Sequence, residues 1–406
     1  MNNTIDKFIE ENIKTAIELE TLLSSVPAIS PVSGGEGEAA KAEALEKWLR
    51  SRGFDNFTYM NAPDDRVPSG YRPNVILTIP GRNSGRSLWI MSHLDVVPPG
   101  NRDLWDTDPY KVTEKEGKLY GRGTEDNQQG MVSSVMAALA LKENGIVPEY
   151  DVKLLFVADE EVGSEYGIIH IIDNYPALFG KDDLVLVPDS GCAEGDEIQI
   201  AEKNVFWFRF TTEGVQCHGA YPSAGKNAFL AGCDLALRLH TLQDEYSGIR
   251  NELFDTPYST FSPTKKEANV PNVNTIPGND VFCMDCRILP EIDIDEVKSK
   301  IEAHCRAVEE KHGVKISVDT LQASISKASA MDSEICTKLR KAIKEVAGKD
   351  ARGIGSSGAT VAAHLRNMGL NVAVWSTIED SMHMPNEYSV IANLVNDAKV
   401  MARLMM

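Results

Sequence analysis

Apolar residues near the start of the chain recur at the spacing of an amphipathic helix. They are Ile5, Phe8, Ile9, Ile13, Ala16 and Ile17. Steps of three and four residues place such positions on one helix face, so we expect a single helix over residues 1–23. Residues 38–53 are also helical in character and stop at Gly53, a residue at which helices often end. The intervening residues are expected to form a loop.

Short apolar runs then alternate with helical stretches. The runs expected to be strands are 75–81, 87–92, 153–158, 184–188 and 371–377. A helix is expected from about Asn127 to Glu143, stopped by Asn144 and Gly145. Continuous apolar runs are typical of strands that are covered on both faces. The alternation therefore predicts an α/β domain with a largely parallel sheet.

The pattern changes near residue 202. A strand with one aromatic face is expected at 204–214, followed by a helix over 226–242 and a turn-rich stretch up to Gly278. A strand (281–289), a helix (296–313) and a strand (314–320) come next. This order suggests a small, ferredoxin-like α+β domain. We therefore expect a catalytic domain made of residues 1–202 and 325–406, interrupted by an inserted domain of residues 203–324.

Composition and charge narrow the classes of function. The 406 residues carry a formal net charge of -19, and such an acidic chain is not expected to bind nucleic acid or anionic membranes. No apolar run reaches the roughly 18 residues of a membrane span. The N-terminus lacks the basic and apolar segments of a secretory signal. Cys283 and Cys286 form a C-x-x-C pair inside an expected strand, and we interpret them as buried thiols in a reducing cytoplasm.

Residues suited to metal binding stand at the ends of the expected strands or at a helix start. They are His93 with Asp95, Asp126, Glu160 with Glu161, Asp189, and His383. In open parallel sheets, ligands bind beyond the carboxyl ends of the strands. One such residue alone is usually a hydrogen-bonded surface group, but several carboxylates on one rim repel unless cations lie between them. Mixed histidine and carboxylate ligands suit zinc or a similar ion. Five ligands with one carboxylate shared suit two ions about 3.5–4 Å apart.

Two neighbouring positions indicate further roles. Asp95 lies two residues after His93, on the same side of an extended segment. Its carboxylate can accept the second ring N–H of His93 and so fix the tautomer of the ring. Glu160 and Glu161 cannot both point the same way from a regular strand. We therefore expect one of them to bind metal and the other to act as a general base.

The order His-x-Asp, Asp, Glu-Glu, Asp, His, with its local contexts, resembles the co-catalytic metallopeptidase family. This family includes acetylornithine deacetylase, succinyl-diaminopimelate desuccinylase, carboxypeptidase G, aminoacylase and the carnosinase-like dipeptidases. The resemblance is carried by MSHLDVVPPG, LYGRGTEDNQQG, FVADEEVGS, VPDSG, QCHGAYPSAGKNA, NTIPG and HMPNE, between about residues 90 and 390. It implies a zinc-peptidase-like catalytic domain with an inserted lid and dimerisation domain.

The resemblance also implies a role for each residue of the rim. The ligands would be His93, Asp126 and Asp189 for one ion, and Asp126, Glu161 and His383 for the other. Zinc is the expected metal, with cobalt and manganese as alternatives. Asp95 would orient His93. Glu160 would take a proton from the water that attacks the amide carbonyl, and would pass it to the leaving amine.

In the inserted domain, the resemblance implies contacts with the substrate. His218 would reach the active site of a neighbouring subunit and steady the tetrahedral intermediate, which implies a homodimer. Asn274 and Arg287 match positions that contact the substrate carboxylate. Gly358 and Thr360, in SSGAT, match the glycine-rich substrate loop.

The chain departs from the family pattern at three places. The family's loop at the bridging aspartate often reads D-x-K-G, whereas residues 127–130, which follow Asp126, read NQQG and lack the lysine. Asp189 stands where desuccinylases and carboxypeptidase G have Glu, while peptidase-type members more often have Asp. Residues 361–364 read VAAH where desuccinylases have an acidic residue and an arginine. These departures weaken the case for a desuccinylase activity.

Three functions follow from these observations. The first is a dinuclear amidohydrolase that removes an acyl group or an amino acid from a small N-acyl amino acid or peptide with a free carboxylate. The second is a dipeptidase, which would require a free amine on the substrate. The third is a binding protein that has kept this fold without catalysis. Such proteins usually lose metal ligands or the base, and here all of them are present.

Overall fold

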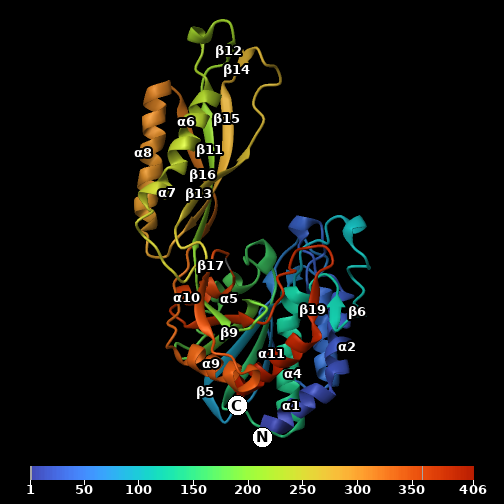
Figure 1. Cartoon of the computed structure of the whole chain (residues 1–406). Helices are drawn as coiled ribbons and strands as arrows, with labels where there is room; N and C mark the ends of the chain where they lie inside the picture. The colour runs from blue at the N-terminus through green and yellow to red at the C-terminus, as the bar shows by residue number, and fades with distance from the viewer. Residues whose placement is uncertain (1, 359) are drawn as a thin grey trace. The chain divides into compact units, whose positions relative to one another are not determined.

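The structure, a computed structural model that describes residues 2–358 and 360–406, divides the chain into two units (Figure 1). Unit 1 contains residues 2–200, 329–354 and 360–406, and unit 2 contains residues 201–328 and 355–358. The sequence predicted domain boundaries at 202/203 and 324/325. It did not predict that residues 355–358 group with the inserted unit.

An eight-stranded sheet with the order β1-β4-β8-β5-β9-β18-β10-β17 forms the centre of unit 1. Its strands are β1 (Phe57–Tyr59), β4 (Val75–Ile79), β5 (Asn83–His93), β8 (Tyr150–Val157), β9 (Leu184–Gly191), β10 (Glu197–Glu202), β17 (Arg352–Ser356) and β18 (Val372–Ser376). The four central strands, β8, β5, β9 and β18, run parallel to each other, whereas β4 and β10 run antiparallel to their neighbours. The sheet is therefore mixed, and its parallel part is the buried centre. β18, from near the C-terminus, lies inside the sheet between β9 and β10.

Helices cover this sheet. They are α1 (Asn2–Glu11), α2 (Ile13–Ser24), α3 (Ala39–Ser51), α4 (Gln129–Glu143), α5 (Ile168–Asn174), α9 (Glu334–Ala347), α10 (Ala362–Asn367) and α11 (Ile391–Met405). The single helix predicted over residues 1–23 is wrong, because Asn12 has non-helical backbone angles (φ -108°, ψ 23°) and separates α1 from α2. None of the described helices is long and apolar enough to cross a membrane.

Small sheets complete the described strands. In unit 1, β6 (Thr113–Lys115), β7 (Lys118–Tyr120) and β19 (Tyr388–Val390) form a three-stranded sheet, and β2 (Ala62–Pro63) pairs with β3 (Tyr71–Arg72). In unit 2, β12 (Cys217–His218) pairs with β14 (Thr275–Ile276).

Unit 2 is built on a four-stranded antiparallel sheet with the order β13-β15-β11-β16. Its elements are β11 (Asn204–Glu213), α6 (Ala228–His240), α7 (Leu242–Glu245), β13 (Thr260–Lys266), β15 (Asn279–Ile288), α8 (Ile294–His312) and β16 (Lys315–Ser324). This is the β-α-β-β-α-β order expected of a ferredoxin-like domain. β13 lies inside the stretch predicted to be turn-rich. It is an edge strand with a proline and exposed lysines, a composition that hides edge strands from pattern analysis.

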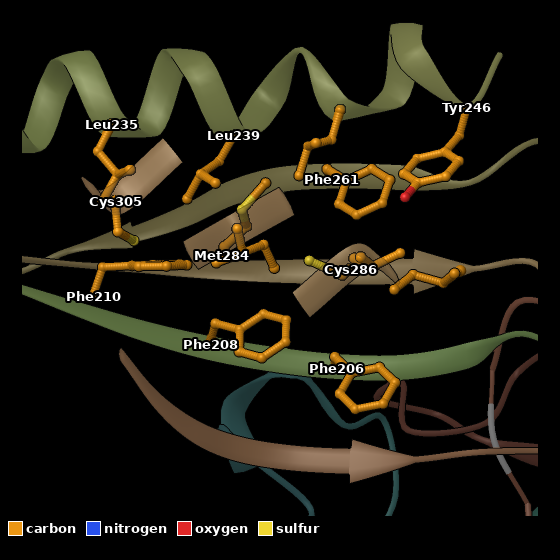
Figure 2. Close-up of a cluster of buried hydrophobic side chains, with 14 of the residues drawn as sticks. Phe206, Phe208, Phe210, Leu235, Leu239, Tyr246, Phe261, Met284, Cys286 and Cys305 are labelled. Carbon is orange, nitrogen blue, oxygen red and sulfur yellow. The ribbon is translucent and has the colours of Figure 1, made fainter. Parts of the chain in front are cut away.

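Alternating apolar residues build the core of unit 2. Figure 2 shows Phe206, Phe208 and Phe210 of β11 on the same face as Met284 and Cys286 of β15, beneath α6. Successive side chains of a strand point to opposite faces, so every second residue joins this core. Cys286 is therefore a core thiol, and Cys283, three residues earlier, is buried from the other face. Both are free thiols.

Candidate metal centre

The ends of the parallel strands bring the expected ligands together. His93 is the last residue of β5, Asp189 lies two residues before the end of β9, and Glu161 is in a 3-10 turn (Glu160–Val162) that follows β8. Asp126 lies in a distorted turn before α4, and His383 lies between β18 and β19. Because β8, β5 and β9 are parallel neighbours, their carboxyl ends meet at one edge of the sheet.

The five residues form two triads that share Asp126. Nε2 of His93 lies 2.9 Å from Oδ1 of Asp126 and 3.4 Å from Oδ1 of Asp189. Nε2 of His383 lies 3.0 Å from Oδ2 of Asp126 and 3.0 Å from Oε2 of Glu161. Within each triad the candidate ligand atoms lie within 4.8 Å of one another. Each oxygen of Asp126 therefore faces a different histidine, the arrangement of a carboxylate that bridges two ions.

Unpaired oxygens indicate that these residues fit divalent ions. Oε1 of Glu161 and Oδ1 of Asp189 are buried and have no hydrogen-bond partner among the described residues. Buried polar atoms in folded proteins are nearly always hydrogen-bonded, so a buried carboxylate oxygen without a partner in each of the two triads requires an explanation. One histidine nitrogen and two carboxylates per triad are a donor set that zinc and similar ions accept.

The pKa shifts of the clustered carboxylates and histidines also favour bound cations. Burial, together with the charge of Asp189, raises the pKa of Glu160 well above its ordinary value, and burial with the charge of Asp126 raises the pKa of Glu161 to about 6. Hydrogen bonds to Asp126 and Glu161 raise the pKa of His383 to about 10. In the metal-free chain the carboxylates are thus under mutual repulsion, which protonated histidines offset. Bound cations would remove this repulsion.

Asp95 contacts both the first histidine and the turn after β8. Its carboxylate accepts hydrogen bonds from the main-chain N–H groups of Glu160 (3.1 Å) and Glu161 (3.0 Å). Nδ1 of His93 lies 3.0 Å from the main-chain oxygen of Asp95 and 3.5 Å from its carboxylate. The role predicted for Asp95, orienting His93, stays a prediction. The bonds to the turn are an addition that the sequence did not suggest.

Two buried glutamates that the sequence did not single out hold the ligand loops. Glu387 accepts hydrogen bonds at 3.0 Å from the main-chain N–H groups of Gly123, Glu125 and Asp126, and it pairs with the guanidinium of Arg122. Glu125 in turn accepts hydrogen bonds from the main-chain N–H and the hydroxyl of Ser381, two residues before His383. The loops that carry Asp126 and His383 therefore support each other. The stretches GRGTED and HMPNE contain both glutamates, but nothing local distinguishes them from surface residues.

The stretch that departs from the family pattern also has a structural role. Nδ2 of Asn127 donates to the main-chain oxygen of Pro188, next to Asp189. Nε2 of Gln129 donates to the main-chain oxygen of Thr377 (2.7 Å) and to Asp397 (3.2 Å). These amides connect the start of α4 to the ends of β9 and β18.

The residues expected to contact the substrate do not all belong to one unit. In unit 2, His218 is exposed, and the main-chain oxygen of Asn274 accepts a hydrogen bond from Gly219 beside it. Arg287 makes two hydrogen bonds to Asp285 (2.8 and 2.9 Å) and donates to the main-chain oxygen of Ser357. This engagement of Arg287 by Asp285 was not predicted. Gly358 follows Ser357 in unit 2, whereas Thr360 belongs to unit 1.

Comparisons with known proteins identify the family. Residues 89–406 match the model of peptidase family M20/M25/M40. An uncharacterized metallohydrolase of Methanocaldococcus jannaschii is 40% identical over 404 residues, which cover 96% of this chain and 98% of that one. Succinyl-diaminopimelate desuccinylase of Bordetella petrii is 30% identical over 239 residues, which cover 58% and 60% of the two chains.

Solved structures confirm the fold class. The dipeptidase Dug1p of Saccharomyces cerevisiae matches with a TM-score of 0.78 at 18% identity, over 100% of this chain and 98% of that one. Human carnosine dipeptidase 1 matches with a TM-score of 0.73 at 17% identity, over the same shares. With the family model covering most of the chain and two candidate metal-ligand triads present, the chain belongs to peptidase family M20/M25/M40 and is a metal-dependent hydrolase of amide bonds.

Proposed function

We propose that this hydrolase uses two divalent ions, with zinc as the first choice and cobalt or manganese as alternatives, to cleave small N-acyl amino acids or short peptides. The observation that carries the proposal is the position of Asp126, whose two carboxylate oxygens each face the histidine of a different triad. A single ion would need only one of these triads. Inorganic analysis of the purified protein should therefore find two ions per chain.

Glu160 is the proposed general base. When bound, the two ions would lower the pKa of a water molecule and polarise the amide carbonyl. Glu160 precedes the ligand Glu161, and its main chain is fixed by Asp95. Its carboxylate takes the proton that the attacking water loses, and the C–N bond breaks as that proton passes to the leaving amine. A raised pKa suits a carboxylate that must both accept and return a proton.

A free carboxylate on the substrate is the second part of the proposal. Arg287, with Asn274, Gly358 and Thr360 as further contacts, is the residue proposed to bind it. Relatives with succinyl-diaminopimelate desuccinylase and acetylornithine deacetylase names act on acylated amino acids, which supports this class. The alternative is a dipeptidase, which is supported by Asp189 as the fifth ligand and by the dipeptidase fold neighbours.

A matched substrate panel tests these proposals. The metal-free protein is reloaded with zinc, cobalt or manganese and assayed on acetyl, succinyl and aminoacyl derivatives of one amino acid, each with a free or an amidated carboxylate. Turnover of the free carboxylates alone would support the proposal. Preference for the aminoacyl derivatives would select the dipeptidase. Absence of turnover on every member would refute hydrolysis of this substrate class and favour a binding protein.

We also propose that unit 2 is a lid and dimerisation domain, through which His218 reaches the site of a second copy. The outer side of α6 exposes Phe229 (44%), Leu230 (57%) and Leu237 (70%). An apolar helix surface of this kind often marks an interface. The double variant Leu230→Asp/Leu237→Asp should sediment as a monomer if the parent is a dimer. Val147→Asp, at an exposed apolar residue of unit 1, is the matched control. A parent protein that is monomeric would contradict the proposal.

A further inference from the structure

A fully buried arginine of unit 1 lies among three carboxylates, one of which belongs to the residue before Glu160. Arg72, the last residue of β3, is 0% exposed. Its guanidinium makes two hydrogen bonds to Glu38, and its Nη2 lies 3.0 Å from Oδ1 of Asp159. Nη1 lies 3.6 Å from Oδ2 of Asp64. None of these residues is among the five proposed metal ligands, and Arg72 is too buried to contact a substrate.

Asp159 closes the turn that presents Glu160 and Glu161. Its backbone has a positive φ of 68°, a conformation that aspartate adopts more readily than most residues. The main-chain oxygen of Asp159 accepts a hydrogen bond from Ser164 at 2.7 Å, and its Oδ2 accepts one from the main-chain N–H of Tyr166 at 3.1 Å. Oδ1 remains for Arg72. Asp159 thus joins the turn to Arg72 through one oxygen while the other oxygen closes the turn.

The turn therefore has two charged supports. Asp95 accepts the N–H groups of Glu160 and Glu161, and Arg72 holds Asp159. A buried ion pair is a poor means of stabilising a fold, because desolvation offsets much of the attraction and apolar residues can often replace it without loss. A buried arginine with a fixed, planar set of donors is instead well suited to hold several carboxylates in one geometry.

We propose that Arg72 is a positioning residue that, through Asp159, sets the direction of Glu160 and Glu161. This inference rests on the proposed dinuclear site. It implies that the two ions respond differently. Glu161 belongs only to the triad with Asp126 and His383, so loss of Arg72 should weaken the binding of the ion at that triad. The ion at His93, Asp126 and Asp189 should bind as before. It also implies that the base Glu160 loses its alignment.

The test measures metal binding and catalysis separately. Metal-free Arg72→Met is titrated with Co²⁺, and the two binding steps are followed by visible absorption. The Co²⁺ affinity of one step should fall about 10- to 100-fold, the range found when residues that support metal ligands are replaced, while the affinity of the other step is unchanged. In the loaded enzyme kcat should fall and KM should stay the same. Arg72→Lys should restore part of both effects, because lysine keeps the charge without the planar fork.

Arg66→Met is the matched control. Arg66 makes two hydrogen bonds (2.8 and 2.9 Å) to Asp64, the carboxylate that also lies near Arg72, and its guanidinium lies over the ring of Tyr166. Unlike Arg72, its side chain is 42% exposed. Both metal steps and kcat should match the parent protein in this variant.

Two results would overturn the inference. The first is Arg72→Met with both Co²⁺ steps unchanged, and the second is an equal weakening of both steps, which would mark a general structural role. If Arg72→Met does not fold, Asp159→Asn, which keeps the pair of Arg72 with Glu38, is judged by the same split between the steps. A split in binding without hydrolysis of any tested amide would refute the proposed function and leave the inference standing.

Discussion

Removal of the Glu387 carboxylate should destabilise unit 1 and weaken the binding of both metal ions. Glu387 is 0% exposed and receives four donors: Arg122 and three main-chain N–H groups of the loop that carries Asp126. Glu387→Ala leaves a guanidinium buried without its partner, and breaking a buried ion pair in this way costs about 3–5 kcal/mol. Because Asp126 is shared by both triads, its displacement should weaken both Co²⁺ steps by about 10- to 100-fold.

Glu387→Gln gives a sharper test, because the structure leaves the amide no good orientation. Oε2 of Glu387 accepts from Arg122 and Gly123, and Oε1 accepts from Glu125 and Asp126. Whichever way the amide turns, its NH₂ faces two donors. We therefore expect this nearly isosteric change to lower the free energy of unfolding by about 2–6 kcal/mol, since each of the two buried donors left without an acceptor costs about 1–3 kcal/mol.

Urea unfolding of the metal-free protein, followed by tryptophan fluorescence, measures this loss. Four of the five tryptophans lie in unit 1, so the signal reports mainly on that unit. Burial raises the pKa of Glu387 to about 7, and the measurement is made well above that pH, where the parent carboxylate is charged. At this pH the cost of burying the charge lowers the stability of the parent and so offsets part of the loss expected for the neutral variant. Asp380→Asn, an exposed acid on the loop before His383, is the control and should stay within about 0.5 kcal/mol of the parent. A Glu387→Gln variant as stable as this control would refute the reasoning.

Three further predictions test other parts of the molecule. Glu160→Gln should abolish hydrolysis while the protein still binds two ions by elemental analysis; loss of metal would make Glu160 a ligand instead. The pKa of about 10 for His383 in the metal-free chain means that the ring is protonated at neutral pH and must lose its proton to bind metal. The affinity for the metal should therefore rise with pH up to that value, and metal binding should release protons into a weakly buffered solution. Binding without proton release would contradict this. Phe210→Ala, at a fully buried ring 4.9 Å from that of Phe282, should destabilise unit 2 by about 3–5 kcal/mol, as reported by the fluorescence of Trp207 during urea unfolding; a smaller change than in an exposed-site variant would count against this core.

The central strands were predictable because burial on both faces demands continuous apolar runs. Strand direction was not predictable in the same way: β4 is as apolar as its neighbours but runs antiparallel to β8. The break at Asn12 was hidden because apolar spacing continues across it, from Ile9 to Ile13. β13 was missed because an edge strand needs few apolar residues.

Much of the candidate site could be derived from the sequence, since each expected ligand follows a strand or precedes a helix. Glu125 and Glu387 could not be derived, because their partners are main-chain N–H groups of loops more than 250 residues away in the chain. Arg72 illustrates the same limit. Its sequence neighbours give no sign of the three carboxylates that fold around it.

The place of β18 in the middle of the sheet determines when unit 1 can be completed during synthesis. Domains generally fold as they leave the ribosome, N-terminal parts first. Unit 2 is nearly finished at residue 328, but the slot between β9 and β10 stays open until residues 372–376 emerge, and His383 comes later still. The nascent chain therefore carries four of its five candidate ligands long before it can hold the second ion. A chain that stops before β18 would expose two unpaired strand edges to chaperones or to other nascent chains.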